Sequence, residues 1–244
     1  MLELVTIAPH GSAVDRAFGT LIERAQAMVV QLVDRHRQPR RAPPTASLIA
    51  KLEQLGIRPD LLKWGPMTLL PYRAEYLLDE VQRRPPRSVL EIGAGASTLL
   101  FAALSARYGF TLVSVENFAG SVEYVRRLLR ESAIDSRVIV QKCGFKRGRF
   151  PDGSGYWWYD AELGLSAANY DFVFVDGPMS TLVGREGMLP EVLPFLAPGA
   201  RVYVDDTHHR HGRRCLATWT RNYPALVVID GCEGISKLSI PGHP

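Results

Sequence analysis

One stretch of the chain constrains its fold more than any other: residues 89–104 read VLEIGAGASTLLFAAL, and residues 113–117 read VSVEN. This is the order of an apolar strand, a glycine turn, a helix and a second strand that ends in an acid. Gly93 and Gly95 suit a sharp turn at the strand end, because residues without a Cβ let the backbone bend while a ligand lies against it. The pattern predicts a strand–turn–helix unit with a small-molecule site at the turn.

The polar residues around this turn suit a nucleotide-like ligand. Ser97 and Thr98 can cap the following helix, whose first free N–H groups would then face the ligand. Glu116 comes about one βαβ unit later, where an acid can hold the two ribose hydroxyls of an adenosine group. A dinucleotide would favour a third glycine, and that position is Thr98. A dinucleotide-binding dehydrogenase is therefore the disfavoured alternative.

The acid Glu91 stands two residues before the first glycine, and the segment EIGAG at residues 91–95 resembles the first motif of class I S-adenosylmethionine-dependent methyltransferases. Together with VSVEN, FVFVDGP and VYVDDTHH, it resembles methyltransferase family 24, which gathers small-molecule and sugar O-methyltransferases. The resemblance covers about residue 64 to the C-terminus. It implies S-adenosyl-L-methionine as cofactor, with contacts at Glu91, Gly93, Ala94, Gly95, Ser97, Thr98, Glu116, Asn117 and Asp176.

Composition narrows the class of protein. With 244 residues, of which 46% are hydrophobic, the chain is long enough for a full α/β core. The net charge is +4, but the basic residues are not interleaved with aromatic ones, so no nucleic-acid partner is expected. No apolar run approaches the roughly 18 residues of a membrane span, and the start of the chain has no signal-peptide core. We therefore expect no membrane partner and a cytoplasmic location.

The N-terminal part has a helical pattern. Three helices are expected, at residues 13–36, 45–55 and 71–83, with a proline-rich linker at 39–44. This gives an N-terminal helical extension or lid over residues 1–85, followed by a methyltransferase domain over residues 86–244. The long apolar stripe of the first helix predicts either packing on the core domain or a homodimer interface.

After residue 86, short apolar runs alternate with helical stretches. Strands are expected at residues 89–92, 112–115, 138–141, 172–175, 202–204, 226–229 and 235–240. Such alternation predicts an α/β fold with a Rossmann-like, doubly wound, seven-stranded sheet that is mainly parallel. The short link before the final run suits a hairpin, so one antiparallel strand is expected near the C-terminus.

Three acids follow two of these strands. Asp176 ends one strand, and Asp205 with Asp206 ends the next, so their carboxylates should share the carboxyl edge of the sheet. The structural alternative is that they merely cap helices. In the metal-dependent relatives, acids at these positions bind magnesium, and a hard divalent ion prefers oxygen ligands. The resemblance thus implies a Mg²⁺ site formed by these three residues.

The general base is not given by the resemblance. The macrolide-sugar O-methyltransferases, which are more distant relatives, carry a further acid two residues after the first metal ligand as the proposed base. This chain has Pro178 at that position. His208 and His209 are the candidate general bases, because imidazole can take a hydroxyl proton near neutral pH. His211 is a weaker candidate, and Asp176 is also expected to be a catalytic residue. The expected reaction is methyl transfer to a hydroxyl of a small polar acceptor, with a sugar favoured and Mg²⁺ assisting. The alternatives are a metal-independent O- or N-methyltransferase and a non-catalytic cofactor-binding partner protein.

Several other residues have two readings each. The aromatic run at residues 156–159 suits a loop that lines a cleft, or plain packing. Trp64 and Tyr72 can close over the cofactor or anchor a core. Cys143 follows a strand and is expected to be a small buried residue and not a nucleophile. For Arg185, a surface ion pair is favoured over a contact with a substrate anion.

Overall fold

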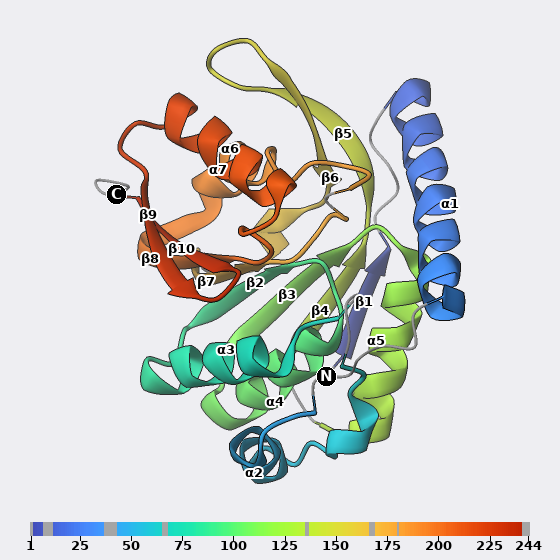
Figure 1. Ribbon diagram of the computed structural model, residues 1–244, viewed down its shortest axis with the longest axis vertical. Coiled ribbons are helices and arrows are strands. Elements are labelled where there is room, and N and C mark those ends of the chain that lie inside the picture. Colours follow the sequence, from blue (N-terminus) through green and yellow to red (C-terminus); the bar gives the residue numbers. More distant parts are fainter. Residues whose placement is uncertain are drawn as a thin grey trace.

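The computed structural model describes residues 2–6, 12–36, 43–64, 68–134, 137–165, 169–179 and 181–240. At its centre lies an eight-stranded sheet with the order β1-β4-β3-β2-β7-β8-β10-β9 (Figure 1). Strand β10 is antiparallel to both of its neighbours, and the other paired strands run parallel. The predicted Rossmann-like, doubly wound sheet with one antiparallel strand near the C-terminus is confirmed.

The strands of this sheet are β1 (Leu2–Thr6), β2 (Ser88–Ile92), β3 (Thr111–Glu116), β4 (Val138–Lys142), β7 (Tyr170–Val175), β8 (Leu196–Val204), β9 (Val227–Cys232) and β10 (Ile235–Ser239). All seven expected strands are present, but the expected number is wrong by one. The additional strand, β1, pairs in parallel with β4 and extends the sheet at that edge. Its five residues form a strand through this pairing, which no local pattern announces.

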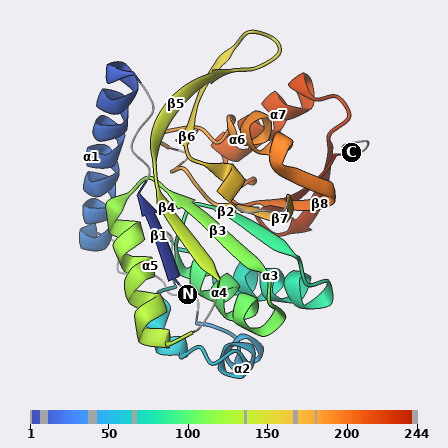
Figure 2. The same ribbon diagram turned by 180° about the vertical axis from the view of Figure 1, so that it is seen from behind.

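The helices are α1 (Ala13–His36), α2 (Ala46–Gln54), α3 (Pro71–Arg83), α4 (Ala96–Tyr108), α5 (Ala119–Ser132), α6 (Met188–Val192) and α7 (Arg210–Asn222), with short 3₁₀ turns at Pro59–Leu61, Leu163–Leu165 and Leu193–Phe195. Helices α2 to α5 lie on one side of the sheet, and α6 and α7 lie on the other (Figures 1 and 2). Local signals explain two helix starts. Thr45 Oγ1 accepts a hydrogen bond from Leu48 N at 3.0 Å, and α3 begins with Pro71.

A two-stranded hairpin, β5 (Gly144–Arg149) and β6 (Gly155–Asp160), lies on the same side as α6 and α7 (Figure 1). The aromatic run at residues 156–159 forms strand β6, so the expectation of a loop is wrong. Because neighbouring side chains of a strand point to opposite faces, both faces of the hairpin receive aromatic rings. Trp158 is buried in the core, whereas Trp157 stacks on Phe18 of α1 with ring centroids 3.8 Å apart.

The N-terminal elements pack on different parts of the molecule. Helix α1 lies beside β5, whereas α2 packs on α3 and α3 packs on α4. The expected boundary near residue 85 stays a prediction, and most of the expected linker lies outside the described residues. The outward face of α1 carries large apolar side chains that are more than half exposed: Val14, Leu21, Met28 and Leu32. Within the described ranges, no helix has the length and apolar character needed to cross a membrane.

Candidate active site

The centre of the sheet is a topological switch point. From β2 the chain continues outward to β3 on one side, and β7 lies on the other side of β2. The ends of these strands are tied together: Gly93 N donates to Val115 O at 2.8 Å, while Asp176 N and Gly177 N both donate to Ile92 O at 2.8 and 2.7 Å. Open α/β sheets bind ligands in the crevice at such a switch point.

The two glycines of the turn have different surroundings. Gly93 has φ +98°, and a Cβ there would lie 2.6 Å from Gly177 N, so no side chain fits at this position. A Cβ on Gly95 would meet no atom of the described residues within 4 Å. Gly93 is therefore required by the close approach of the neighbouring strand end, and Gly95 faces open space where a ligand fits.

Glu91 is fully buried beside this turn. Its Oε2 accepts hydrogen bonds of 2.6 Å from Thr98 Oγ1 and from Ser114 Oγ, while its Oε1 is buried without a hydrogen-bond partner among the described residues. Burial raises the pKa of Glu91 to about 7, against the effect of the surrounding hydroxyls, including that of Ser97. A buried carboxylate oxygen without a donor fits a cationic group, such as the ammonium of the methionine part of S-adenosylmethionine.

The hydroxyls of the turn serve this carboxylate more than the helix. Helix α4 starts at Ala96 with Gly95 as its N-cap, and Thr98, at the third helical position, caps it through its side chain as expected, whereas Ser97 does not. Thr98 Oγ1 does accept from Gly95 N at 3.0 Å while it donates to Glu91. Ser114 was not expected at the site. Its place opposite Glu91 in the parallel register of β2 and β3 is the signal that points to it.

Glu116 and Asn117 lie at the end of β3, as expected from the motif. Glu116 Oε1 accepts hydrogen bonds from Asn117 N and Phe118 N, each at 2.8 Å, and burial raises the pKa of Glu116 to about 7. The Asn117 side chain is held between two elements: it donates to Gln26 Oε1 at 3.0 Å and accepts from Tyr159 OH at 3.1 Å. This arrangement fixes the acid beside the turn, where the resemblance places the ribose.

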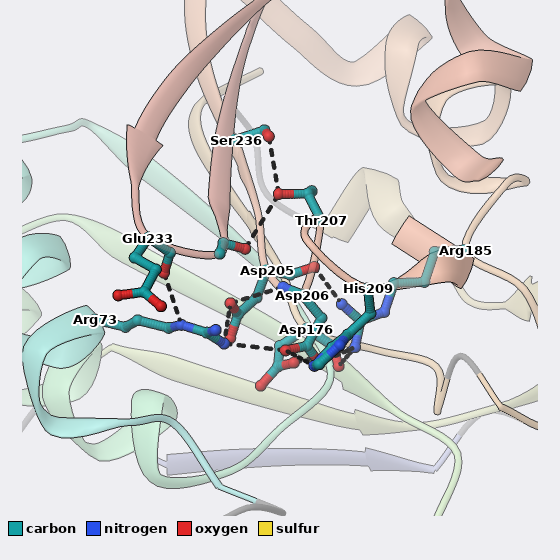
Figure 3. A network of polar contacts seen from close by, with 10 residues as sticks. Arg73, Asp176, Arg185, Asp205, Asp206, Thr207, His209, Glu233 and Ser236 are labelled. Carbon is teal, nitrogen blue, oxygen red and sulfur yellow. Dashed lines mark hydrogen bonds and ion pairs between the residues drawn. The ribbon is translucent and has the colours of Figure 1, made fainter. Parts of the chain in front are cut away.

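The three predicted magnesium ligands do come together, but with two arginines among them (Figure 3). Arg73 Nη1 donates to Asp205 Oδ1 at 2.7 Å and to Asp206 Oδ1 at 3.0 Å. Arg185 Nη2 donates to Asp176 Oδ1 at 3.1 Å and lies 3.7 Å from Asp206 Oδ2. Each of the three carboxylates therefore already has a cationic partner.

Both arginines are buried, so the expectation of a surface ion pair at Arg185 is wrong. Arg73, on α3, was not expected here, since it lies 132 positions before Asp205 in the chain. Burial and the repulsion from neighbouring acids raise the pKa values of Asp176 and Asp205, and the guanidinium groups oppose this effect. The three carboxylates are thus paired with two guanidinium groups, whose positive charges oppose the binding of Mg²⁺ at the same place.

The candidate bases lie at the start of α7, at the same edge of the sheet. His208 and His209 are exposed, with ring centroids 3.8 Å apart, and His209 Nε2 lies 3.9 Å from Asp206 Oδ1. Partial burial and the neighbouring His209 and Arg73 lower the pKa of His208, which favours the neutral form that accepts a proton. His211 is also exposed. The role of base stays a prediction for all three.

Other expected residues have structural positions. Trp64 is buried as an anchor, whereas Tyr72 is 37% exposed. Cys143 is buried, its Sγ lies 3.6 Å from Glu116 O, and burial raises the pKa of its thiol well above the usual range. The prediction that Cys143 is a small buried residue is confirmed.

Residues 90–207, which carry this switch point and its acids, match the family model of a methyltransferase domain. This segment is a class I S-adenosylmethionine-dependent methyltransferase domain. The match begins on β2 and ends just after Asp205 and Asp206, so it contains the glycine turn and the acids of the site but not Arg73.

Solved structures share the fold of this methyltransferase at low sequence identity. The methyltransferase PaMTH1 of Podospora anserina, solved with S-adenosylhomocysteine, is 14% identical with a TM-score of 0.53, covering 89% of this chain and 96% of its own. A Geobacter sulfurreducens methyltransferase is 16% identical with a TM-score of 0.51, covering 87% and 94%. A Staphylococcus aureus protein provisionally named a caffeoyl-CoA O-methyltransferase is 13% identical with a TM-score of 0.51, covering 90% and 100%. No curated protein sequence matches the chain significantly.

Proposed function

We propose that this methyltransferase transfers a methyl group from S-adenosylmethionine to a hydroxyl of a small polar acceptor, with a sugar favoured. The observation that carries the proposal is the buried Glu91 Oε1, which has no donor among the described residues, together with the open space at Gly95 of the same turn. This pair of features suits the methionine part of the cofactor. The provisional name of the Staphylococcus aureus protein supports oxygen as the accepting atom.

The acceptor would lie at the edge formed by Asp206, His208 and His209. When bound, S-adenosylmethionine supplies a methyl group activated by its sulfonium, so the protein must mainly orient the acceptor oxygen in line with it. One of the two histidines would take the hydroxyl proton, and Asp206 can accept hydrogen bonds from a polyhydroxyl ligand. The expected Mg²⁺ is left out of this proposal, since Arg73 and Arg185 already pair with the carboxylates.

The test has two stages on the full chain. Calorimetric titration with S-adenosylhomocysteine and, separately, with NAD measures which cofactor binds. Methyl transfer from labelled S-adenosylmethionine is then measured on a panel of sugars, catechols and primary amines. Glu91→Ala serves as the cofactor-site variant, and Arg221→Ala, an exposed arginine on α7, serves as the control.

Binding of S-adenosylhomocysteine with transfer to a hydroxyl supports the proposal. If the protein binds S-adenosylhomocysteine but methylates amines alone, the acceptor assignment is wrong and the N-methyltransferase alternative replaces it. If it binds neither cofactor, the glycine turn is a structural strand-to-helix turn, and the role of a non-catalytic partner protein takes precedence.

A further inference from the structure

The two arginines of the site are held independently of the acids that they neutralise. Arg185 donates to three backbone carbonyls, those of Pro178, Asp205 and Asp176, at 3.2, 2.8 and 2.6 Å. Arg73 Nε donates to Glu233 O at 3.1 Å. Because these carbonyls belong to the backbone next to the strand ends, the guanidinium groups keep their places even when a carboxylate rotates.

Arg73 is also fixed by packing. It is 4% exposed, and a Cβ built on Gly234 would lie 2.2 Å from Arg73 Nη2, so the guanidinium fills the space beside this glycine. Thr207 N donates to Gly234 O at 3.0 Å, which holds the turn between β9 and β10 against the end of β8. The arginine therefore cannot leave the acids without disturbing this turn.

The charges of the site are nearly balanced without an ion. Three carboxylates and two guanidinium groups leave a formal charge of one negative unit. A divalent ion bound to Asp205 Oδ1 would lie next to Arg73 Nη1, which is 2.7 Å from the same oxygen. Like charges at such a distance repel strongly in a buried site.

One cavity beside Asp205 and Asp206 is small as well. The cavity lined by Arg185, Asp205, Asp206, His211 and Cys215 has a volume of about 10 Å³. That volume is about the minimum that holds one water molecule. Mg²⁺ gives up its waters reluctantly and keeps several of them in most protein sites. A hydrated ion does not fit in this cavity.

From these observations we infer that Arg73 and Arg185 take the place of the divalent cation, so that the methyltransferase works as a metal-independent enzyme. The inference rests on the proposed function for the identity of the reaction. Its main test is a titration of the protein with metal ions, which does not depend on any acceptor. In this arrangement Arg185 is a positioning residue, because it ties the ends of β7 and β8 together and sets the orientation of Asp176. Arg73 is also a positioning residue, because it sets the orientation of the carboxylates of Asp205 and Asp206.

The test is a titration of the full chain with Mn²⁺, followed by electron paramagnetic resonance, and with Mg²⁺ by calorimetry. The wild type should bind neither ion at concentrations up to about 1 mM, and its affinity for S-adenosylhomocysteine should agree within about twofold in Mg²⁺ and in a chelator. Arg73→Met, which removes the charge but keeps an unbranched side chain, should gain Mn²⁺ affinity by about tenfold or more. This gain is expected because Asp205 loses the arginine that pairs with its carboxylate, and Asp206 loses the nearer of its two arginines.

A matched control is available in the same sheet. Arg201 is also buried, but it donates to the carbonyls of Glu80 and Arg84 and lies away from the acids of the site. Arg201→Met should not create Mn²⁺ binding. If Arg73→Met does not fold, Arg73→Ala is titrated in the same way and should show the same gain in Mn²⁺ affinity over the wild type.

Two results would overturn the inference. One is wild-type Mn²⁺ binding that Asp205→Asn abolishes, which would place an ion among the three acids despite the arginines. The other is wild-type binding that His208→Ala and His209→Ala abolish. Among the described residues, the donor atoms of Asp206, His208 and His209 lie within 4.8 Å of one another, so this outcome would place the ion on the outer side of Asp206. Failure to bind S-adenosylhomocysteine in any condition would instead refute the proposed function, and the metal titrations would still stand.

Discussion

Replacing Glu91 with glutamine tests the electrostatics of the cofactor site directly. Glutamine keeps the shape of the side chain and can still accept hydrogen bonds from Thr98 and Ser114, but it removes a charge that is fully buried. Its amide N–H₂ replaces the carboxylate oxygen Oε1, to which no described residue donates. In the absence of a cofactor the folded protein should therefore tolerate this change, and it should benefit from it at high pH.

The magnitude follows from the pKa of Glu91, which burial raises from 4.5 to about 7. Because the folded-state value is higher, the folded protein holds this proton more tightly than the unfolded chain does. The corresponding contribution to stability is present below pH 4.5 and is lost as the pH rises through 7, a total of about 3 kcal/mol. Between pH 5.5 and 8.5 the loss is about 2 kcal/mol for Glu91 and none for glutamine.

The assay is urea unfolding of the wild type and of Glu91→Gln at pH 5.5 and 8.5, without cofactor. The stability of the variant relative to the wild type should increase by about 2 kcal/mol from the lower to the higher pH. The same stability difference at both pH values would refute the reasoning, since it would mean that Glu91 titrates alike in the folded and unfolded chain. Ser114→Ala, which removes a hydroxyl that favours the charged form, should enlarge the pH dependence.

Four further outcomes are expected. Gly93→Ala should lower the free energy of unfolding by about 3 kcal/mol or more, measured by urea unfolding, because φ is +98° and the new Cβ meets the neighbouring strand end; Gly95→Ala should fold but bind S-adenosylhomocysteine more weakly. Glu116→Ala should weaken calorimetric S-adenosylhomocysteine binding by about tenfold to a hundredfold, and an unchanged affinity would exclude Glu116 from the ribose site. Leu21→Glu with Met28→Glu should convert a dimer into a monomer in light scattering, and a monomeric wild type would refute pairing through α1.

The fold could be predicted well because a parallel sheet covered on both faces requires continuous apolar strands. Residues 89–92 and 172–175 are such runs, and the glycine turn after the first marks the switch point without any tertiary information. Strand β1 gives no such signal, because as an edge strand it depends on the presence of β4. The hairpin of β5 and β6 is harder to predict for another reason. Its four adjacent aromatic residues suggest a loop by their type, and only the alternation of side chains along a strand explains how they are shared between two faces.

The candidate site could be predicted in part. The motif acids gather where the sequence predicts, but their partners could not be predicted from spacing. Arg73 sits in the middle of α3, and only the packing of α3 against the sheet brings its guanidinium to Asp205. For Arg185 the sequence predicts a surface position, because arginines are usually exposed. Burial of both was decided by tertiary contacts with backbone carbonyls, which leave no trace in the local sequence.

The acids along this edge of the sheet have different cationic partners on the two sides of the proposed site, the cofactor side and the acceptor side. On the cofactor side, Glu91 has no cationic partner among the described residues, which suits a ligand that brings its own positive charge. On the acceptor side, two arginines already pair with the three acids. The two halves also interact, because the charge of Asp176 adds to the rise in the pKa of Glu91. Burial is nevertheless the main cause of that rise, so the role of Arg185 is geometric: it pairs with Asp176 and ties the ends of β7 and β8 together.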